Sequence, residues 1–405
     1  MRILFLSYAY PSPWTPNQGT FNRTMLAALA ERHDVHVLCP VPFLTYWQRQ
    51  PTALQSSPNV TATYVPFYYT PKLGRTWYDT WLKRSVQGAV EKLMERFQPD
   101  VMLSYWTHPD GAAALFFGRR YRKPVAIVTG GSDVLLLGRS GRRGAAIRRT
   151  LAAADAILPI GDHLAETLKS DGVAASRIHT IYRGVDRNMF KPGDRLAARR
   201  RLGLSANGRL LIGVGRLVPV KAWPDVLVAC ARLKEAGVLF RCHLLGDGPL
   251  RKSLDAQIRL LSLEDCVEIS GSQPQSRLAD WYRAADITVL ASTSEGVPNV
   301  LLESICCGTP FVATRVGSIP VIADPLIDRL VPPSHPSLLA ESLLDSLTQQ
   351  QFGGGEAQRA WLPPSSQESA DRLEAILESL INSPKDACPE SLLSESSAEQ
   401  YALTS

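Results

Sequence analysis

Glu295-Gly-Val-Pro-Asn-Val-Leu-Leu-Glu303 places two carboxylates eight positions apart, the first on a polar loop and the second on an apolar segment. The run just upstream, residues 285–291, is mostly apolar and typical of a buried strand. Pro298 and Asn299 are residues that favour the start of a helix. The stretch therefore predicts a strand, then a loop that carries Glu295, then a helix that carries Glu303 about one turn from its start.

The start of this predicted helix is a candidate anion site. The backbone amides of Asn299, Val300 and Leu301 would lack helical acceptors and would point out of the helix end. Phosphate is the usual anion at such a terminus. Glu295 and Glu303 would repel a phosphate unless they bind something else, and sugar hydroxyls are natural partners for carboxylates. We therefore expect a phosphate and a sugar to bind here together.

Strand and helix patterns alternate along the chain in two successive blocks, which is typical of α/β folds with doubly wound parallel sheets. The expected strands are 3–7, 35–39, 60–65, 101–104, 125–129 and 156–160, and then 210–214, 241–245, 267–270, 287–291, 311–314 and 329–331. We expect two Rossmann-like domains, residues 1–188 and 189–362, with a ligand cleft between the carboxyl edges of their sheets. Residues 363–383 predict a further amphipathic helix, and the Ser- and Glu-rich tail 384–405 predicts disorder.

Composition indicates a globular protein of the cytoplasm. The 405 residues fit two or three domains, and 45% hydrophobic with 20% charged residues is ordinary for a globular chain. No window reaches the roughly 20 apolar residues of a membrane span. The apolar N-terminus runs into Pro11 and Pro13 and lacks a small-residue cleavage site, so it predicts a strand rather than a signal peptide. Seven cysteines without a CxxC pair are typical of reduced thiols.

The net charge of +6 is unevenly distributed. Residues 1–190 hold 23 Lys and Arg against 13 Asp and Glu, a balance of +10, and the remainder has a balance of −4. A basic half attracts nucleic acid, anionic lipid or acidic polymers, but the chain has no nucleic-acid motif. Two interpretations stay open: solvated helix faces, or peripheral docking on the inner, anionic face of the plasma membrane. The basic cluster concerned contains Arg142, Arg143, Arg148 and Arg149.

Residues 294–317 read S-E-G-V-P-N-V-L-L-E-S-I-C-C-G-T-P-F-V-A-T-R-V-G. This string resembles the signature of the retaining, nucleotide-sugar-dependent glycosyltransferases of family GT4, which have the GT-B fold. The resemblance covers about residues 1–380 and is densest over 209–323. Pro109-Asp-Gly111 and Gly131-Ser-Asp133 look closest to the branch that builds extracellular polysaccharides and teichuronic-acid-like polymers.

The resemblance implies a hexosyltransferase that moves a sugar from a nucleoside-diphosphate sugar to a hydroxyl of a polysaccharide or lipid-linked glycan precursor. It also implies a last helix that crosses back to the first domain. Arg216 and Lys221 match the family's G-R-L-x-x-x-K element, which holds the donor diphosphate. Fixed cations there stabilise a departing diphosphate as it gains charge. The chain has no Asp-x-Asp pair and no metal-ligand spacing, so the sequence requires neither a metal nor another cofactor.

The resemblance assigns the remaining residues of the second domain to the donor. Glu295 matches the glutamate that contacts the donor sugar and is most tied to turnover. Glu303 matches the glutamate that accepts hydrogen bonds from the ribose hydroxyls. Gly246 belongs to a G-D-G-P turn at the edge of the donor pocket, and Gly271 lies in the loop that usually contacts the nucleobase.

Three residues of the first domain are candidates for substrate binding. Gly19 follows the first predicted strand, where glycine lets backbone approach a phosphate closely. His108 lies in a loop after another strand, between Trp106 and Pro109, although a lone histidine is often structural. Asp133 lies in a third such loop, which resembles the family's H-G-S-D stretch.

The chain departs from the family pattern at four positions. Gly130 stands where a histidine that touches the donor sugar is frequent, Arg183 replaces the asparagine of N-G-V-D, and Ser318 and Val321 depart from G-G-x-P-E. Two alternatives to the transferase therefore stay open. One is a sugar-nucleotide-binding protein that has lost catalysis, and the other is a different enzyme on the same fold, such as a sugar-nucleotide epimerase or a phosphorylase.

Overall fold

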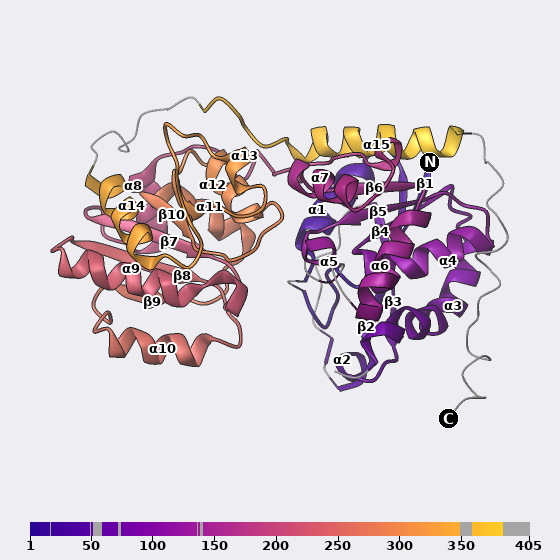
Figure 1. Cartoon of the computed structure of the whole chain (residues 1–405), viewed down its shortest axis with the longest axis horizontal. Coiled ribbons are helices and arrows are strands. Elements are labelled where there is room, and N and C mark those ends of the chain that lie inside the picture. The colour runs from indigo at the N-terminus through magenta and orange to yellow at the C-terminus, as the bar shows by residue number, and fades with distance from the viewer. Residues whose placement is uncertain are drawn as a thin grey trace.

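The computed structural model describes residues 1–16, 18–48, 50–51, 59–71, 74–135, 137, 141–348 and 359–383. The predicted disordered tail, residues 384–405, lies outside them. The prediction of two doubly wound parallel sheets is confirmed, because the described residues form two parallel sheets of six strands each, in two lobes (Figure 1). Every expected strand range corresponds to one observed strand.

The first sheet has the strand order β3-β2-β1-β4-β5-β6. Its strands are β1 Arg2–Leu6, β2 Asp34–Pro42, β3 Val60–Phe67, β4 Val101–Tyr105, β5 Val125–Thr129 and β6 Ala156–Pro159. Its helices are α1 Thr20–Leu29, α2 Phe43–Gln48, α3 Tyr78–Arg96, α4 Ala112–Arg120, α5 Ser132–Leu135, α6 Gly141–Ala153 and α7 Asp162–Ser170. The strand order reverses between β1 and β4, so the loops after these two strands face the same crevice.

The second sheet repeats this plan with the order β12-β11-β10-β7-β8-β9. Its strands are β7 Arg209–Val214, β8 Phe240–Leu245, β9 Val267–Ile269, β10 Ile287–Leu290, β11 Phe311–Thr314 and β12 Arg329–Val331. Its helices are α8 Arg195–Leu202, α9 Trp223–Glu235, α10 Arg251–Leu260, α11 Gln275–Ala284, α12 Asn299–Cys306, α13 Ile319–Ile322 and α14 Pro336–Thr348. Here the order reverses between β7 and β10, which places the loops after these two strands side by side.

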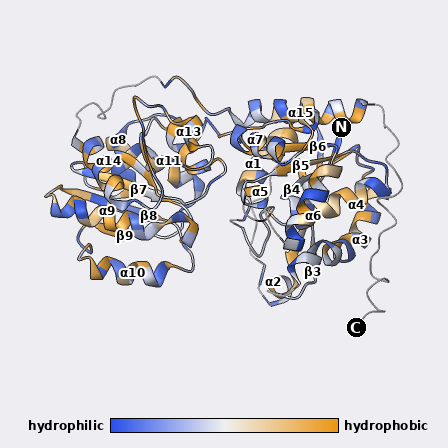
Figure 2. Cartoon of the chain, in the orientation of Figure 1, coloured by the Kyte–Doolittle hydropathy of each residue, from blue (hydrophilic) through white to orange (hydrophobic). Residues whose placement is uncertain are grey.

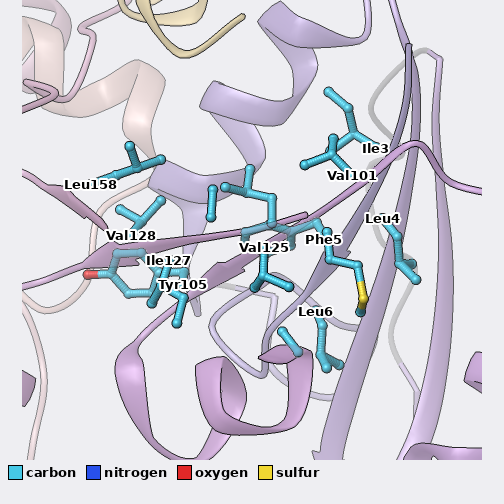
Figure 3. Packing of buried hydrophobic residues seen from close by; sticks show 14 of the residues in the cluster. Ile3, Leu4, Phe5, Leu6, Val101, Tyr105, Val125, Ile127, Val128 and Leu158 are labelled. Atoms are coloured by element: carbon cyan, nitrogen blue, oxygen red, sulfur yellow. The ribbon is translucent and has the colours of Figure 1, made fainter. Parts of the chain in front are cut away.

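The strands are apolar because both faces of each sheet are covered by helices. Ile3, Phe5, Leu103 and Ile127 have no exposed surface, and Figure 3 shows how such side chains of neighbouring strands pack together. The helices carry both hydrophilic and hydrophobic residues along their length (Figure 2), as expected for elements with one face on a sheet and one in water.

The last helix, α15 Ser366–Asn382, packs on the first domain although it follows the second in the chain (Figure 1). Leu373 and Leu377 have no exposed surface and belong to the core of the first domain. A capping box between Ser365 and Glu368 fixes the start of this helix. Arg32, just after α1, forms an ion pair with Asp371 at 2.5 Å.

The two crossings between the domains are joined to each other by hydrogen bonds. The Val185 amide donates to the Pro364 carbonyl at 2.9 Å, and the Ser366 amide donates to the Val185 carbonyl at 3.1 Å. A Cβ on Gly184 would lie 2.5 Å from the Ser366 Cα, so only glycine permits this approach. We call residues 182–187 and 363–366 the hinge.

The basic cluster on α6 is smaller on the surface than its sequence predicts. Arg142, Arg148 and Arg149 are exposed, but Arg143 is half-buried, and burial together with nearby Arg75 lowers its pKa. Three of the four arginines of this cluster are therefore exposed to solvent. In the described part of the chain, no helix combines the length and the apolar composition needed to cross a bilayer.

Candidate active site

The loops after β7 and β10 meet because these strands are neighbours in the second sheet. The Thr293 amide donates to the Val220 carbonyl at 2.9 Å and ties the two loops together. The Lys221 ammonium then lies 2.5 Å from the Glu295 carboxylate, and Ser292 donates to the same Glu295 oxygen at 2.6 Å. Both charged side chains are mostly buried, with 18% and 13% exposed. The residue predicted to bind the diphosphate, Lys221, and the residue predicted to bind the sugar, Glu295, therefore form an ion pair.

The loop of Glu295 is also where the two domains touch. A Cβ on Gly131 of the first domain would lie 3.2 Å from the Gly296 Cα, and one on Gly161 would lie 2.7 Å from a methyl group of Val297. Gly317 holds the other side of this loop, since a Cβ there would lie 2.0 Å from the Glu295 carbonyl oxygen. Glu295 is thus fixed at the seam between the domains.

The α12 terminus differs from the expectation in one amide. The Leu301 amide donates to the Pro298 carbonyl at 3.0 Å, so it is not free, and the Leu301 side chain is fully buried. Pro298, the residue before α12, thereby closes the first turn. For Asn299 and Val300, no such backbone acceptor occurs among the described residues. These two amides remain as donors for an anion at the helix start.

Glu303 lies one turn further along α12 and faces Tyr282 of α11. The Tyr282 hydroxyl, which is fully buried, donates to the Glu303 carboxylate at 2.9 Å. Burial raises the pKa of Glu303 from 4.5 to about 7, and the tyrosine hydrogen bond lowers it only in part. The carboxylate therefore titrates near neutral pH and retains acceptor capacity for a ligand.

The other candidates of the second domain lie around this ion pair. The Arg216 side chain is exposed, and its carbonyl accepts a hydrogen bond from the Trp223 indole at 2.8 Å, which fixes the turn after β7. A Cβ on Gly246 would lie 1.9 Å from the Gly215 carbonyl oxygen, so the turns after β7 and β8 are in direct contact. Gly271 has a positive φ of 73°, and a Cβ there would lie 3.8 Å from the Arg251 guanidinium.

Gly19 of the first domain has a structural reason to be glycine. Its φ is +65°, and a Cβ would lie 2.1 Å from the Ala9 carbonyl oxygen. The Asn22 side chain donates to that same carbonyl at 2.6 Å. The two ends of the loop between β1 and α1 are thus packed backbone against backbone, beside the crevice between β1 and β4.

Asp133 organises two loops of the first domain. One of its carboxylate oxygens accepts from the Gly130 and Gly131 amides at 3.1 and 3.0 Å. The other accepts from the Thr107 amide and hydroxyl at 3.1 and 2.9 Å. Asp133 is fully buried, and burial raises its pKa. Four donors occupy its oxygens, so Asp133 positions the loops after β4 and β5.

His108 turns away from the seam and towards α3. Its side chain is fully buried, and its Nε2 lies 3.5 Å from a carboxylate oxygen of Asp79. Asp79 also accepts from Lys83 at 3.0 Å. Burial opposes ionisation of Asp79, but His108 and Lys83 together lower its pKa below the ordinary range. The structure therefore does not bring His108 to Glu295, Lys221 or the start of α12.

Sequence reasoning missed Arg183 as a site residue, although it marked the position as unusual. The Arg183 guanidinium donates to the Tyr105 hydroxyl of β4 and to the Asn299 side-chain oxygen of α12, the latter at 3.2 Å. It also lies over the Phe21 ring, 4.0 Å from the ring centre. Tyr282 and Ser292 were missed as well, because neither belongs to a motif.

Two family descriptions match the chain side by side. "Glycosyltransferase Family 4" matches residues 18–188, and "Glycosyl transferases group 1" matches residues 194–361. The provisionally assigned teichuronic acid biosynthesis glycosyltransferase TuaC of Bacillus subtilis is 26% identical over 96% of both chains. The D-inositol 3-phosphate glycosyltransferase of Thermobispora bispora is 40% identical, over 42% of this chain and 43% of that protein.

Solved structures share the fold at low sequence identity. Sucrose-phosphate synthase of Thermosynechococcus elongatus has a TM-score of 0.72 at 18% identity, covering 94% of this chain and 96% of its own. HepE of Anabaena, solved with UDP, has a TM-score of 0.67 at 18% identity over 94% and 96%. With both halves of the chain matched and both sheets in the same arrangement, the chain belongs to the family 4 glycosyltransferases and is a transferase with the GT-B fold.

Proposed function

We propose that this glycosyltransferase moves a sugar from a nucleoside-diphosphate sugar to a hydroxyl acceptor, with retention of the anomeric configuration and without a metal ion. The observation that carries the proposal is the Lys221–Glu295 pair, which joins the segment after β7 to the loop that leads into α12. A cation, a carboxylate and two open amides then meet where a sugar joined to a diphosphate needs all three.

Each part of the donor has a partner in this arrangement. Arg216, Lys221 and the amides of Asn299 and Val300 hold the diphosphate, because cations and a helix start both favour negative charge. Glu303 accepts the two ribose hydroxyls. Glu295 accepts hydroxyls of the transferred sugar, and its pairing with Lys221 keeps the carboxylate oriented.

The same groups favour bond cleavage. The diphosphate gains negative charge as it leaves, and fixed cations in a mostly buried site stabilise that charge more than they stabilise the bound donor. Glu295 is already held by Lys221 and Ser292, and we assign it to the hydroxyls of the transferred sugar rather than to the acceptor's proton. The leaving diphosphate then accepts the proton of the attacking hydroxyl on the face that it leaves.

The acceptor is a polysaccharide or a lipid-linked glycan precursor. The support is the similarity over the whole chain to TuaC, together with the exposed arginines of α6 on the first domain. We place the protein in the cytoplasm, bound peripherally to the inner face of the plasma membrane.

The test is a donor screen followed by product analysis. The full chain is mixed with UDP-, GDP- and ADP-sugars, and binding is measured by thermal shift. The preferred donor is then incubated with lipid-linked and soluble glycan acceptors, and the anomeric configuration of the product is determined by NMR. An inverted product contradicts retention. Binding without any transfer or hydrolysis would instead identify a sugar-nucleotide-binding protein.

A further inference from the structure

Arg183 is a hinge residue whose side chain contacts both domains. On the first domain it lies over Phe21 and donates to Tyr105. On the second it donates to Asn299, the first residue of α12. Hydrogen bonds join the two crossings that form the hinge. The backbone from which the Arg183 side chain extends is therefore held in place between the two domains.

The Tyr105 hydroxyl that accepts from this guanidinium has its position because residue 130 is glycine. A Cβ at Gly130 would lie 2.2 Å from the Tyr105 hydroxyl oxygen and 3.3 Å from the Trp106 ring. The Tyr105 ring is 4% exposed, and Figure 3 shows it among the core residues with its hydroxyl directed away from Phe5. Tyr105 therefore fills the volume in which a side chain at position 130 would lie, and it presents its hydroxyl to Arg183.

The charge of Arg183 has no counter-ion in the described part of the chain. It forms no ion pair with a carboxylate there, although it is half-buried. Its partners are a tyrosine hydroxyl and an amide oxygen, which satisfy hydrogen bonds but leave the positive charge unbalanced. A cation that has lost part of its water without gaining an anion is unfavourable, and an anionic ligand removes this cost.

The position of Arg183 identifies that ligand. Asn299 begins the helix whose first two amides are open to an anion, and Lys221 approaches the same loop from the β7 side through Glu295. We propose that Arg183 is a third cation for the donor diphosphate, supplied by the hinge and held in place by Tyr105 over Gly130. The inference rests on the proposed function, since it assumes a nucleoside-diphosphate donor.

In this proposal the hinge binds the donor as well as connecting the two domains. A diphosphate that contacts both Arg183 and the start of α12 links the hinge to the second domain through the ligand. Donor binding then favours the arrangement in which Gly131 meets Gly296. The departures at positions 130 and 183 are then linked through Tyr105, because glycine leaves room for Tyr105 and Tyr105 orients the arginine.

The test separates the phosphates from the nucleoside. For uracil, guanine and adenine, binding of the nucleoside, the monophosphate and the diphosphate to the full chain is measured by calorimetry, and the base that binds most tightly is used. Arg183→Gln is expected to weaken diphosphate binding roughly ten- to hundredfold, because a charge-assisted hydrogen bond is lost. Nucleoside binding is expected to stay unchanged, and Arg183→Lys is expected to lose less.

Arg187→Gln is the matched control. Arg187 lies in the same hinge, donates to the Pro363 carbonyl and pairs with Glu368. Among the described residues, it approaches α12 at Cys306, the last residue of the helix, and not at the helix start. It should leave the ratio of diphosphate to nucleoside affinity unchanged. Tyr105→Phe keeps the cation and removes the hydroxyl that orients it, so it should give a smaller loss confined to the diphosphate.

Two outcomes overturn the inference alone. One is an equal loss of nucleoside and diphosphate binding in Arg183→Gln, and the other is the same change in Arg187→Gln; both would make Arg183 a structural hinge residue. If Arg183→Gln does not fold, Arg183→Lys and Tyr105→Phe decide the matter by the same ratio. Failure of the wild-type protein to bind any of the three diphosphates would overturn the proposed function itself.

Discussion

Glu303 is a carboxylate whose charge state depends on pH in the range where enzymes work. Burial raises its pKa to about 7. An ionised Glu303 accepts both ribose hydroxyls, whereas a protonated one cannot. We therefore expect nucleoside affinity to rise between about pH 6 and pH 8. The measurement is calorimetry with a nucleoside, which carries no phosphate that titrates. Glu303→Gln should remove the pH dependence, and a dependence that survives in this variant would assign it to another group.

The raised pKa of Glu303 also makes the stability of the folded protein depend on pH. In the folded protein Glu303 holds its proton up to about pH 7, whereas in the unfolded chain it loses the proton near 4.5. The folded state therefore binds more protons between these values, and stability conferred by this group falls as pH rises through the window and is constant above it. Urea unfolding of the unliganded wild type and of Glu303→Gln at the two ends of the window measures this difference.

Alanine substitutions of Glu295 and Glu303 are expected to affect different properties, turnover for Glu295 and nucleotide affinity for Glu303. Glu303→Ala should weaken nucleoside and nucleotide binding by about 1.5–3 kcal/mol, because the fork to the ribose is lost. Glu295→Ala should lower kcat far more than nucleotide affinity. It also frees Lys221 from its 2.5 Å ion pair, so diphosphate binding should be unchanged or tighter. Equal losses of diphosphate affinity in the two variants would contradict these roles.

At the residue scale, motifs predicted the identity of the charged groups but not their partners. Lys221 and Glu295 are 74 positions apart, and their contact depends on β7 and β10 being neighbours. Asp133 stands in a motif, yet four donors from two loops occupy it, and such donors leave no pattern in a sequence. The contacts of Arg183 needed both domains to be in place.

At the element scale, the start of α1 depends on a glycine that a phosphate-binding interpretation explains only in part. Gly19→Ala introduces a Cβ 2.1 Å from the Ala9 carbonyl oxygen. Gly237→Ala is the matched control, since Gly237 also has a positive φ, of 74°, but meets nothing within 4 Å. We expect Gly19→Ala to lower the unfolding free energy by roughly 1–3 kcal/mol more than the control. Chemical denaturation measures the unfolding free energies. Equal losses in Gly19→Ala and Gly237→Ala would show that the loop before α1 moves to make room for the new Cβ.

The start of α12 and the two cations beside it are expected to replace a metal ion. Arg216, Lys221 and the amides of Asn299 and Val300 supply the positive charge that a divalent cation would otherwise bring to a diphosphate. Activity should therefore survive extensive dialysis against EDTA. The assay compares dialysed enzyme with and without added magnesium or manganese. Loss of activity on dialysis, with recovery on adding either metal, would refute this.

At the scale of the whole molecule, the uneven charge has a testable consequence. Arg142, Arg148 and Arg149 are exposed on α6 of the first domain. Each cation near an anionic surface contributes roughly 1 kcal/mol and is screened by salt. We expect the protein to float with anionic vesicles at low salt and to be released at high salt. Changing these three arginines to glutamine should reduce flotation strongly.

The control for this experiment removes the same charge elsewhere. Arg200, Arg232 and Arg259 are exposed on helices of the second domain, and their change to glutamine lowers the net charge equally. This variant should still float. If both triple variants float alike, or if the wild type does not float at low salt, docking through α6 is wrong.

The overall architecture was the part most accessible from the sequence. Buried parallel strands are continuous apolar runs, so all twelve could be recognised one by one, and their alternation with helices predicted the doubly wound sheets. Features that arise between elements were not accessible. The half-burial of Arg143 depends on α6 lying near Arg75, and the hydrogen bonds of the hinge join residues 184–185 to residues 364–366.

The position of α15 on the first domain bears on how the protein is made. Residues 370, 373, 376 and 377 complete an apolar core whose other members are synthesised far earlier. A ribosome thus finishes both sheets before the first domain has its full complement of buried side chains. A chain that stops short of α15 leaves an apolar strip on α1 uncovered, and such strips are what chaperones and proteases bind. The apolar surface of the first domain is therefore covered only after α15 has been synthesised. Truncated products expose this surface, so chaperones and proteases can recognise them.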